Sequence, residues 1–153
     1  MKQIQGTSYN IEDDIVGRIT FGKRNLFGRS NDILVCKDSD KPAFGYLATI
    51  TEKTTFSAKD KPYCVVNSVE NFNEGDVVVI NKKGEIIFVY EINSNHNALM
   101  ATERCNHRCI MCPQPPILQE KDKTPFNLQL ISLFDKNTQR DWYNRGRANS
   151  YWR

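Results

Sequence analysis

Three of the five cysteines of the chain lie close together, at Cys105, Cys109 and Cys112. Their spacing is C-x3-C-x2-C, so one short loop could bring three thiolates to one centre. A fourth thiolate would complete a tetrahedral zinc site or an ordinary iron–sulfur cluster. Three thiolates instead leave one iron of a four-iron cluster without a protein ligand, and a substrate-like molecule can bind there. The spacing therefore predicts a cluster with one open coordination position.

The residues around these cysteines resemble those of a known enzyme superfamily. The run 102–116 reads T-E-R-C-N-H-R-C-I-M-C-P-Q-P-P, with the apolar Met111 directly before the last cysteine. The cysteine spacing and Met111 resemble the radical S-adenosylmethionine (SAM) superfamily. The longer run is similar to one branch of that superfamily, the C-type radical SAM maturases of His-Xaa-Ser systems, which modify ribosomally made peptides.

This resemblance implies a set of cofactors and a type of reaction. Cys105, Cys109 and Cys112 would each bind one iron of a 4Fe–4S cluster, and the remaining iron would bind SAM. An electron from the cluster would cleave SAM to methionine and a deoxyadenosyl radical, which would abstract a hydrogen atom from the substrate. Met111 would lie against the adenine of SAM. The implied partners are a precursor peptide with His-Xaa-Ser repeats, a second radical SAM maturase and an electron donor.

Two other interpretations of the cysteine stretch stay open. In one, His107 completes a zinc site, although a histidine between two cysteines only four positions apart is poorly placed to share their tetrahedron. In the other, the chain is a non-enzymatic β-rich binding module with a zinc- or cluster-binding cysteine loop. Arg104, His107 and Arg108 are candidates to tune a cluster by charge and hydrogen bonds, and they could equally form a solvated rim.

The residues before the cysteine stretch predict a β-rich domain over 1–95. Short runs rich in β-branched and aromatic residues lie at 15–21, 33–36, 44–51, 63–66, 76–81 and 85–91. The last two runs flank Lys82-Lys83-Gly84, where the glycine suits a left-handed position in a tight turn. Strands this short and this numerous predict a small β-barrel or sandwich.

Residues 96–139 are expected to begin a radical SAM core. The apolar run 97–102 predicts the first strand of a parallel barrel, because sites in such folds lie at the carboxyl ends of strands. Thr124 as N-cap and Pro125 in the first turn predict a helix over 124–136 that packs back on this strand. The expected fold class is α+β: a small β-rich barrel or sandwich, followed by the first β-loop-α unit of an incomplete radical SAM barrel.

Residues 140–153 break this pattern. They read R-D-W-Y-N-R-G-R-A-N-S-Y-W-R and hold both tryptophans and four arginines against one aspartate. One permitted set of codons for this stretch, read one nucleotide later, encodes E-I-G-I-T-G-G-E-P-T-L-I-G. The resemblance places a G-G-E-P motif at the end of the second strand, beside the amino group of SAM. We therefore expect a frame-shifted tail on a truncated maturase with an incomplete catalytic domain, which sequencing of the gene would test.

Composition and charge limit which classes of function remain for the chain. A hydrophobic content of 39% and a charged content of 25% are typical of a soluble globular protein. Outside 140–153 the chain carries 17 basic and 17 acidic side chains, so its charge does not favour nucleic-acid binding. No apolar run is long enough to span a membrane, and the N-terminus lacks the apolar segment of a secretory signal. We expect a cytoplasmic protein in which Cys36 and Cys64 are buried small hydrophobes and His96 is a surface histidine.

Overall fold

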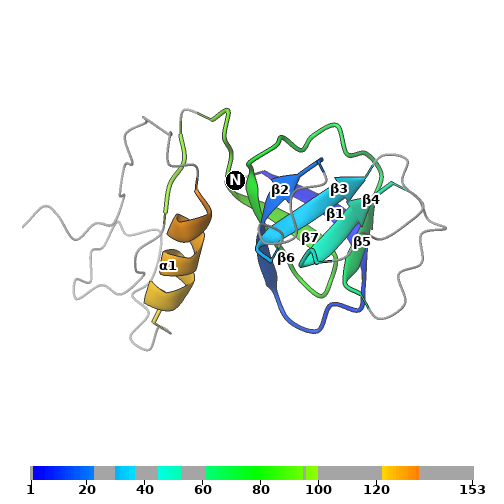
Figure 1. Cartoon of the computed structure of the whole chain (residues 1–153), viewed down its shortest axis with the longest axis horizontal. Helices are drawn as coiled ribbons and strands as arrows, with labels where there is room; N and C mark the ends of the chain where they lie inside the picture. The colour runs from blue at the N-terminus through cyan, green and yellow to red at the C-terminus, as the bar shows by residue number, and fades with distance from the viewer. Residues whose placement is uncertain are drawn as a thin grey trace, which may run out of the picture.

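The structure is a computed structural model that describes residues 2–22, 30–36, 45–52, 61–94, 96–99 and 122–134. These residues form seven strands and one helix, which lies beside the strands (Figure 1). The strands are β1 (Gln3–Tyr9), β2 (Ile15–Thr20), β3 (Asp32–Cys36), β4 (Ala48–Thr51), β5 (Tyr63–Val66), β6 (Val77–Ile80) and β7 (Glu85–Tyr90), and the helix is α1 (Thr124–Leu133). No helix within these ranges has both the length and the apolar character needed to cross a membrane.

The seven strands close into a barrel in the order β1-β5-β4-β3-β2-β6-β7. Four of them, β2 to β5, pair as parallel neighbours. The antiparallel pairs are β2 with β6, β6 with β7, β7 with β1 and β1 with β5. Closure pairs both sides of every strand, so the barrel presents no free sheet edge. The predicted β-rich character of the N-terminal part of the chain is confirmed, and its strands form a barrel.

Alternate residues of the strands fill the barrel, because successive side chains of a strand point to opposite faces. The buried interior residues are aliphatic or aromatic with one cysteine, and include Ile19, Ile33, Val35, Ala48, Ile50, Cys64, Val66, Val78, Ile80, Ile86 and Phe88. This interior explains why the β-branched runs of the sequence became strands: each run supplies the inward positions of one wall.

Strand β1 closes the barrel although its sequence, QIQGTSY, does not predict a strand. Its side chains alternate between exposed and half-buried, and Gly6 permits a close approach to β5. A Cβ atom on Gly6 would lie 2.6 Å from the carbonyl oxygen of Val65 and 2.8 Å from the Cys64 sulfur. Gly84, in the turn between β6 and β7, has a φ of 81°, as predicted for a left-handed turn residue.

A helix forms where one was predicted, but both of its ends differ from the prediction: it ends at Leu133, with Phe134 extended, rather than at 136. Thr124 is the first helical residue rather than the N-cap, and Lys123 occupies the N-cap position without a side-chain cap. The Thr124 N–H donates instead to Asp122 Oδ1 at 2.9 Å. The prediction of Thr124 as the cap was therefore wrong because an aspartate two positions earlier supplies the acceptor.

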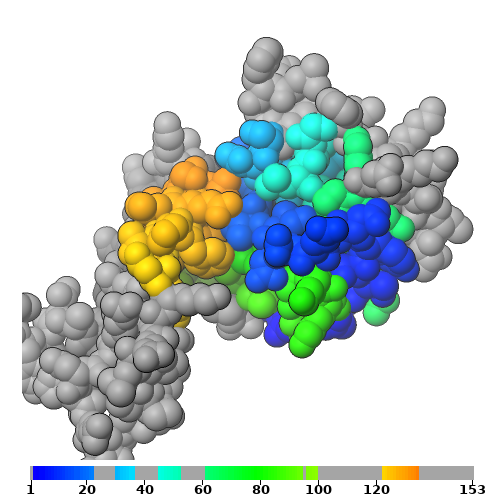
Figure 2. All heavy atoms as spheres, turned by 90° about the horizontal axis from the view of Figure 1, so that it is seen from below, coloured from blue at the N-terminus to red at the C-terminus, as the bar shows by residue number. Residues whose placement is uncertain are grey.

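The helix packs on the outside of the barrel over β2, β6 and β7 (Figures 1 and 2). We call the shared apolar contact the outer cluster: it contains Val16, Val77, Val79, Tyr90, Leu130 and Leu133, with Val89, Ile92, Leu99 and Phe134 packed against it. A register shift between β6 and β7 pairs Val78 with Phe88 but Val77 with Tyr90. This β-bulge places Phe88 inside the barrel and Tyr90 outside, under the helix.

Candidate metal-binding loop and its anchors

The predicted cluster ligands lie between two described segments of the chain. Cys105, Met111 and the other residues with a predicted role at the cluster, namely Arg104, His107, Arg108, Cys109 and Cys112, lie outside the described residues, as does the tail 140–153. The structure describes the entry to this stretch at 96–99 and the exit at 122–134. What it shows is therefore how both ends of the cysteine loop, residues 100–121, are held.

The entry is folded by a local contact between Glu91 and Asn97, which we call the Glu91–Asn97 clasp. The Glu91 N–H donates to Asn97 Oδ1 at 2.9 Å, and Asn97 Nδ2 donates to the Glu91 carbonyl at 2.9 Å. The Ser94 N–H also donates to the Glu91 carbonyl, at 3.0 Å, inside the turn. The side-chain amide of Asn97 thus hydrogen-bonds both the N–H and the carbonyl of Glu91, as the backbone of a neighbouring strand would.

The Glu91–Asn97 clasp lies at the start of the strand that the sequence predicted at 97–102. Its described residues, 97–99, belong to no strand, so the prediction was wrong there. The side chain of Asn97 turns the chain back on residue 91 at the point where a parallel barrel strand was expected. Apolar character alone does not separate a strand from an extended segment that packs one side chain, here Leu99, on a neighbouring surface.

A buried carboxylate ties this turn to the barrel. Asp76 is fully buried at the start of β6, and its Oδ1 accepts a hydrogen bond from the Ile92 N–H at 2.9 Å. Its Oδ2 accepts from the N–H and the side-chain amide of Asn73, at 3.1 and 3.2 Å. Asp76 therefore joins the turn before β6 to the segment after β7, and fixes where the chain leaves the barrel.

The exit from the loop is held by α1. Leu130 and Leu133 are 2% and 4% exposed in the outer cluster, and the ring of Phe134 packs on that of Tyr90. Leu99, two residues after Asn97, packs against the same cluster. Both ends of the cysteine loop therefore rest on one apolar patch of the barrel wall.

The side of α1 opposite Leu130 and Leu133 is also apolar, because it carries the exposed Leu128 and Ile131. Phe126 lies on the same side as Leu130 and Leu133, one turn earlier, and is exposed. Neither the first nor the last turn of the helix carries a charged residue that would stabilise it. The helix therefore owes its position to Leu130 and Leu133 rather than to an amphipathic pattern, because apolar residues lie on both of its sides.

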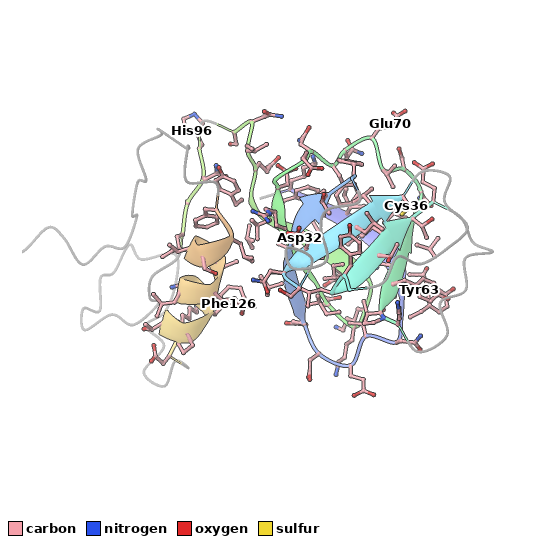
Figure 3. All side chains as sticks on the ribbon, viewed as in Figure 1. Asp32, Cys36, Tyr63, Glu70, His96 and Phe126 are labelled. Carbon is pink, nitrogen blue, oxygen red and sulfur yellow. The ribbon has the colours of Figure 1, made fainter. Side chains whose placement is uncertain are left out.

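The chemistry of the donor set fits the cluster that the spacing predicts. Three cysteine thiolates can bind three irons of a 4Fe–4S cluster and leave the fourth open. Within the described ranges, no group of three histidine, cysteine, aspartate or glutamate side chains comes together as a metal site. His96 is exposed on the segment that connects barrel and helix (Figure 3), where its N–H donates to Ser94 Oγ at 3.1 Å. Its prediction as a surface histidine is confirmed.

The two isolated cysteines are buried in the barrel, as predicted. Cys36 is 8% exposed at the end of β3, and Cys64 is fully buried in the interior. Burial raises the pKa of the Cys64 thiol to about 11 from an ordinary value of 9.0. A thiol that stays protonated at neutral pH is a poor metal ligand, so Cys64 is a packing residue.

The sequence did not identify Asp76 and Asn97 as the residues that hold the entry of the cysteine loop. The sequence predicted Asp76 only as the first residue of the strand run 76–81, and Asn97 only as the first residue of a strand. The available signal was residue type, since asparagine and aspartate side chains often bond backbone groups within a few residues of themselves. That signal indicates a turn near Asn97, but it does not identify Glu91 as the partner.

No protein-family model, curated protein or solved structure matches the chain. The resemblance to radical SAM maturases therefore rests on residues 102–116 themselves.

Proposed function

We propose that this chain provides the cluster-binding part of a radical SAM maturase that modifies a ribosomally made peptide. The observation that carries the proposal is the C-x3-C-x2-C spacing of Cys105, Cys109 and Cys112, with Met111 before the last cysteine. In this proposal the three thiolates hold a 4Fe–4S cluster and leave one iron for SAM. When bound, the cluster supplies the electron that cleaves SAM.

The described residues have a supporting role in this function. The Glu91–Asn97 clasp and Asp76 hold the entry of the cysteine loop, and Leu130 and Leu133 hold its exit. Bringing the ends of a loop together costs conformational entropy, which grows slowly with the length of the loop. In this proposal, contacts that hold the chain on the barrel at both ends of 100–121 restrict the segments on either side of the cysteines before a metal binds.

The substrate and partners follow from the same proposal. The substrate is a precursor peptide with His-Xaa-Ser repeats, modified together with a second radical SAM maturase and with electrons from a donor protein. Free thiolates and a reduced cluster require a reducing compartment, so the proposed location is the cytoplasm.

Anaerobic reconstitution of the full chain with iron and sulfide tests the proposal. We expect roughly four irons per chain and a broad thiolate-to-iron charge-transfer absorbance at about 400 nm. Replacing Cys105, Cys109 and Cys112 together by alanine should abolish both. The matched control is Cys64→Ala, which removes a buried thiol from the barrel interior and should leave the iron content unchanged.

The proposal is wrong if the unsubstituted chain takes up no iron, or if the triple variant retains it. Stoichiometric zinc without iron would instead favour the zinc site with His107, and neither metal would favour a binding module without a metal centre.

A further inference from the structure

We propose that this chain forms a strand-exchanged dimer, in which β1 of each copy lies between β5 and β7 of the other copy's barrel. The partner is a second copy of the chain, and the surface that it recognises consists of the two strand edges that β1 covers. The proposal uses described residues only and is independent of the proposed cluster.

β1 contributes little apolar surface to the barrel interior. All of its residues are exposed or half-buried, whereas every residue of β3, β4 and β6 is buried. Of its inward residues Ile4, Gly6 and Ser8, only Ile4 has a hydrophobic side chain, and it is half-buried against the interior. Segments with few buried apolar contacts open at a lower free energy than the whole domain. β1 is therefore the strand of the described barrel that detaches most readily.

The side-chain contacts of β1 lie where water competes with them. Ser8 Oγ donates to the Lys82 carbonyl at 2.6 Å, at an exposed position. Tyr9 stacks on Tyr63 with the ring centroids 4.6 Å apart, but Tyr9 is 43% exposed. When β1 leaves, water replaces much of what these contacts supply, so their loss costs little. A β1 from a second copy then restores them.

Detachment of β1 leaves two unpaired strand edges with apolar side chains behind them. β1 pairs with β5 over residues 6–9 and with β7 over residues 3–5. Beneath these pairs lie Cys64 and Ile86, which are both fully buried in the closed barrel. Unpaired edges of this kind bind another strand, because each backbone N–H and carbonyl needs a partner.

Gly6 selects which strand fits between β5 and β7. A Cβ atom at Gly6 would lie 2.6 Å from the Val65 carbonyl oxygen and 2.8 Å from the Cys64 sulfur. A strand with a larger residue at this register therefore fits only if β5 moves. An identical β1 carries the glycine and reproduces every pair of the closed barrel, so a second copy is the partner that fits best.

The connection after β1 favours an open form. Glu12, Asp13 and Asp14 are consecutive acidic residues that are exposed and belong to no strand or helix. Like charges along a connection repel one another and extend it, as they do in charged linkers. Ile11, which precedes them, packs on the interior and would move with β1 into the other barrel. An extended segment 12–14 then links the two barrels.

The test mixes two full-length variants whose thiols can pair only between copies. Ser8 and Cys64 lie opposite each other in the register of β1 and β5, on the inward face. One variant carries Ser8→Cys and Cys64→Ala, and the other keeps Ser8 and Cys64. In both variants alanine replaces the remaining cysteines, which are Cys36, Cys105, Cys109 and Cys112. After incubation with a mild oxidant, a non-reducing gel and mass spectrometry measure the disulfide between position 8 and Cys64.

We expect this link at a chain concentration of roughly 1 mM, which is the effective concentration of a strand on a short flexible connection. The linked fraction at a fixed time should rise about tenfold between about 0.1 and 1 mM, because exchange is bimolecular. The matched control places the thiol by Thr7→Cys instead of Ser8→Cys. Thr7 points outward, so this control should give less than about a tenth of the link.

A chain that carries Ser8→Cys and keeps Cys64 checks the pairing within one copy, and it should form the same disulfide internally. An internal disulfide without any link between copies would overturn the proposal. Equal linking by Thr7→Cys would also overturn it, because it would indicate random collision. A missing internal disulfide would overturn it too, since β1 would then not pair with β5 in this register.

Light scattering on the unsubstituted, reduced chain makes the test if the variants do not fold. The chain should be a mixture of monomer and dimer at roughly 1 mM, and a chain that is monomeric there would overturn the proposal. None of these outcomes changes the iron content expected of the unsubstituted chain, so the proposed function is tested separately.

Discussion

The rings of Tyr90 and Phe134 pack with their centroids 4.7 Å apart and their planes inclined by 36°. They join the last strand of the barrel to the end of α1. Tyr90 reaches this position because the β-bulge between β6 and β7 turns it out of the barrel, whereas Phe88 remains inside. A local irregularity in one strand pair therefore creates the surface on which the exit of the cysteine loop is held.

The docking of α1 should depend on Leu133 and not on Leu128. We expect Leu133→Ala to lower the free energy of unfolding by about 2 to 3 kcal/mol, because it removes a buried side chain from the outer cluster. Leu128→Ala, at a side chain that is 61% exposed, should change it by less than about 0.5 kcal/mol. Urea unfolding of both variants makes the comparison, and equal losses would show that α1 is not docked as described.

We expect the effects of substitutions at Arg18 and Asp32 on the free energy of unfolding to depend strongly on each other. Arg18 Nε and Nη2 donate to Asp32 Oδ1 at 3.1 and 3.0 Å, and Asp32 is fully buried. Removing the guanidinium leaves a buried carboxylate without its cation, so Arg18→Ala should cost about 3 kcal/mol in thermal or chemical unfolding.

The matched variant replaces both members by apolar residues of similar size. Arg18→Met with Asp32→Leu removes the buried charge together with its partner, and it should recover most of the stability that Arg18→Ala loses. If the double variant is less stable than Arg18→Ala, the stability lost in Arg18→Ala does not come mainly from leaving the buried Asp32 carboxylate without its cation.

Gly84 should be intolerant of a side chain. Its φ is 81°, and a Cβ atom there would collide with the carbonyl oxygen of Gly6 on β1. Gly84→Ala should therefore destabilise the barrel by about 2 to 3 kcal/mol. Gly22→Ala is the control, since a Cβ at that position would have no neighbouring atom within 4 Å. Similar melting temperatures for the two variants would contradict the closure of the barrel through β1.

The stability of the barrel should fall in alkali through Cys64. Burial raises the pKa of this thiol to about 11, whereas it ionises near 9.0 in the unfolded chain. Below pH 9 both states carry the neutral thiol, and no effect is expected. As the pH rises toward 11, only the unfolded chain ionises, so the native chain should lose about 2 kcal/mol more than Cys64→Ala.

Urea unfolding at pH 8 and at pH 11 measures this difference directly. All other side chains are the same in both proteins, so the comparison between the two proteins isolates Cys64. An identical pH dependence would mean that the thiol is accessible to water in the folded state.

Much of the barrel could be predicted from the sequence, because most inward positions of β2 to β7 carry β-branched or aromatic residues; Ala48 and Cys64 are exceptions. β1 could not, since its inward residues include Gly6 and Ser8, which carry little apolar surface. The parallel order of β2 to β5 also could not be predicted, because it depends on pairings between distant segments. For example, Thr51 lies opposite Val65.

The candidate site also has features that the sequence could predict and features that it could not. The spacing of the three cysteines is a local property, so their role can be predicted without a structure. The anchors depend on geometry: Asp76 and Ile92 are 16 positions apart, and only the folded barrel brings them together. The prediction of a helix beginning at 124 is confirmed, but the helix ends at Leu133 rather than at 136, and the same pattern did not reveal that Phe126, Leu128 and Ile131 would be exposed.

The most direct test of the proposed cluster is electron paramagnetic resonance of the reconstituted and reduced full chain, with and without SAM. If Cys105, Cys109 and Cys112 leave one iron open, the reduced cluster should give a spectrum whose g values change when SAM is added. A cluster signal that SAM does not alter, or iron-free protein carrying zinc, would contradict a radical SAM function for this chain.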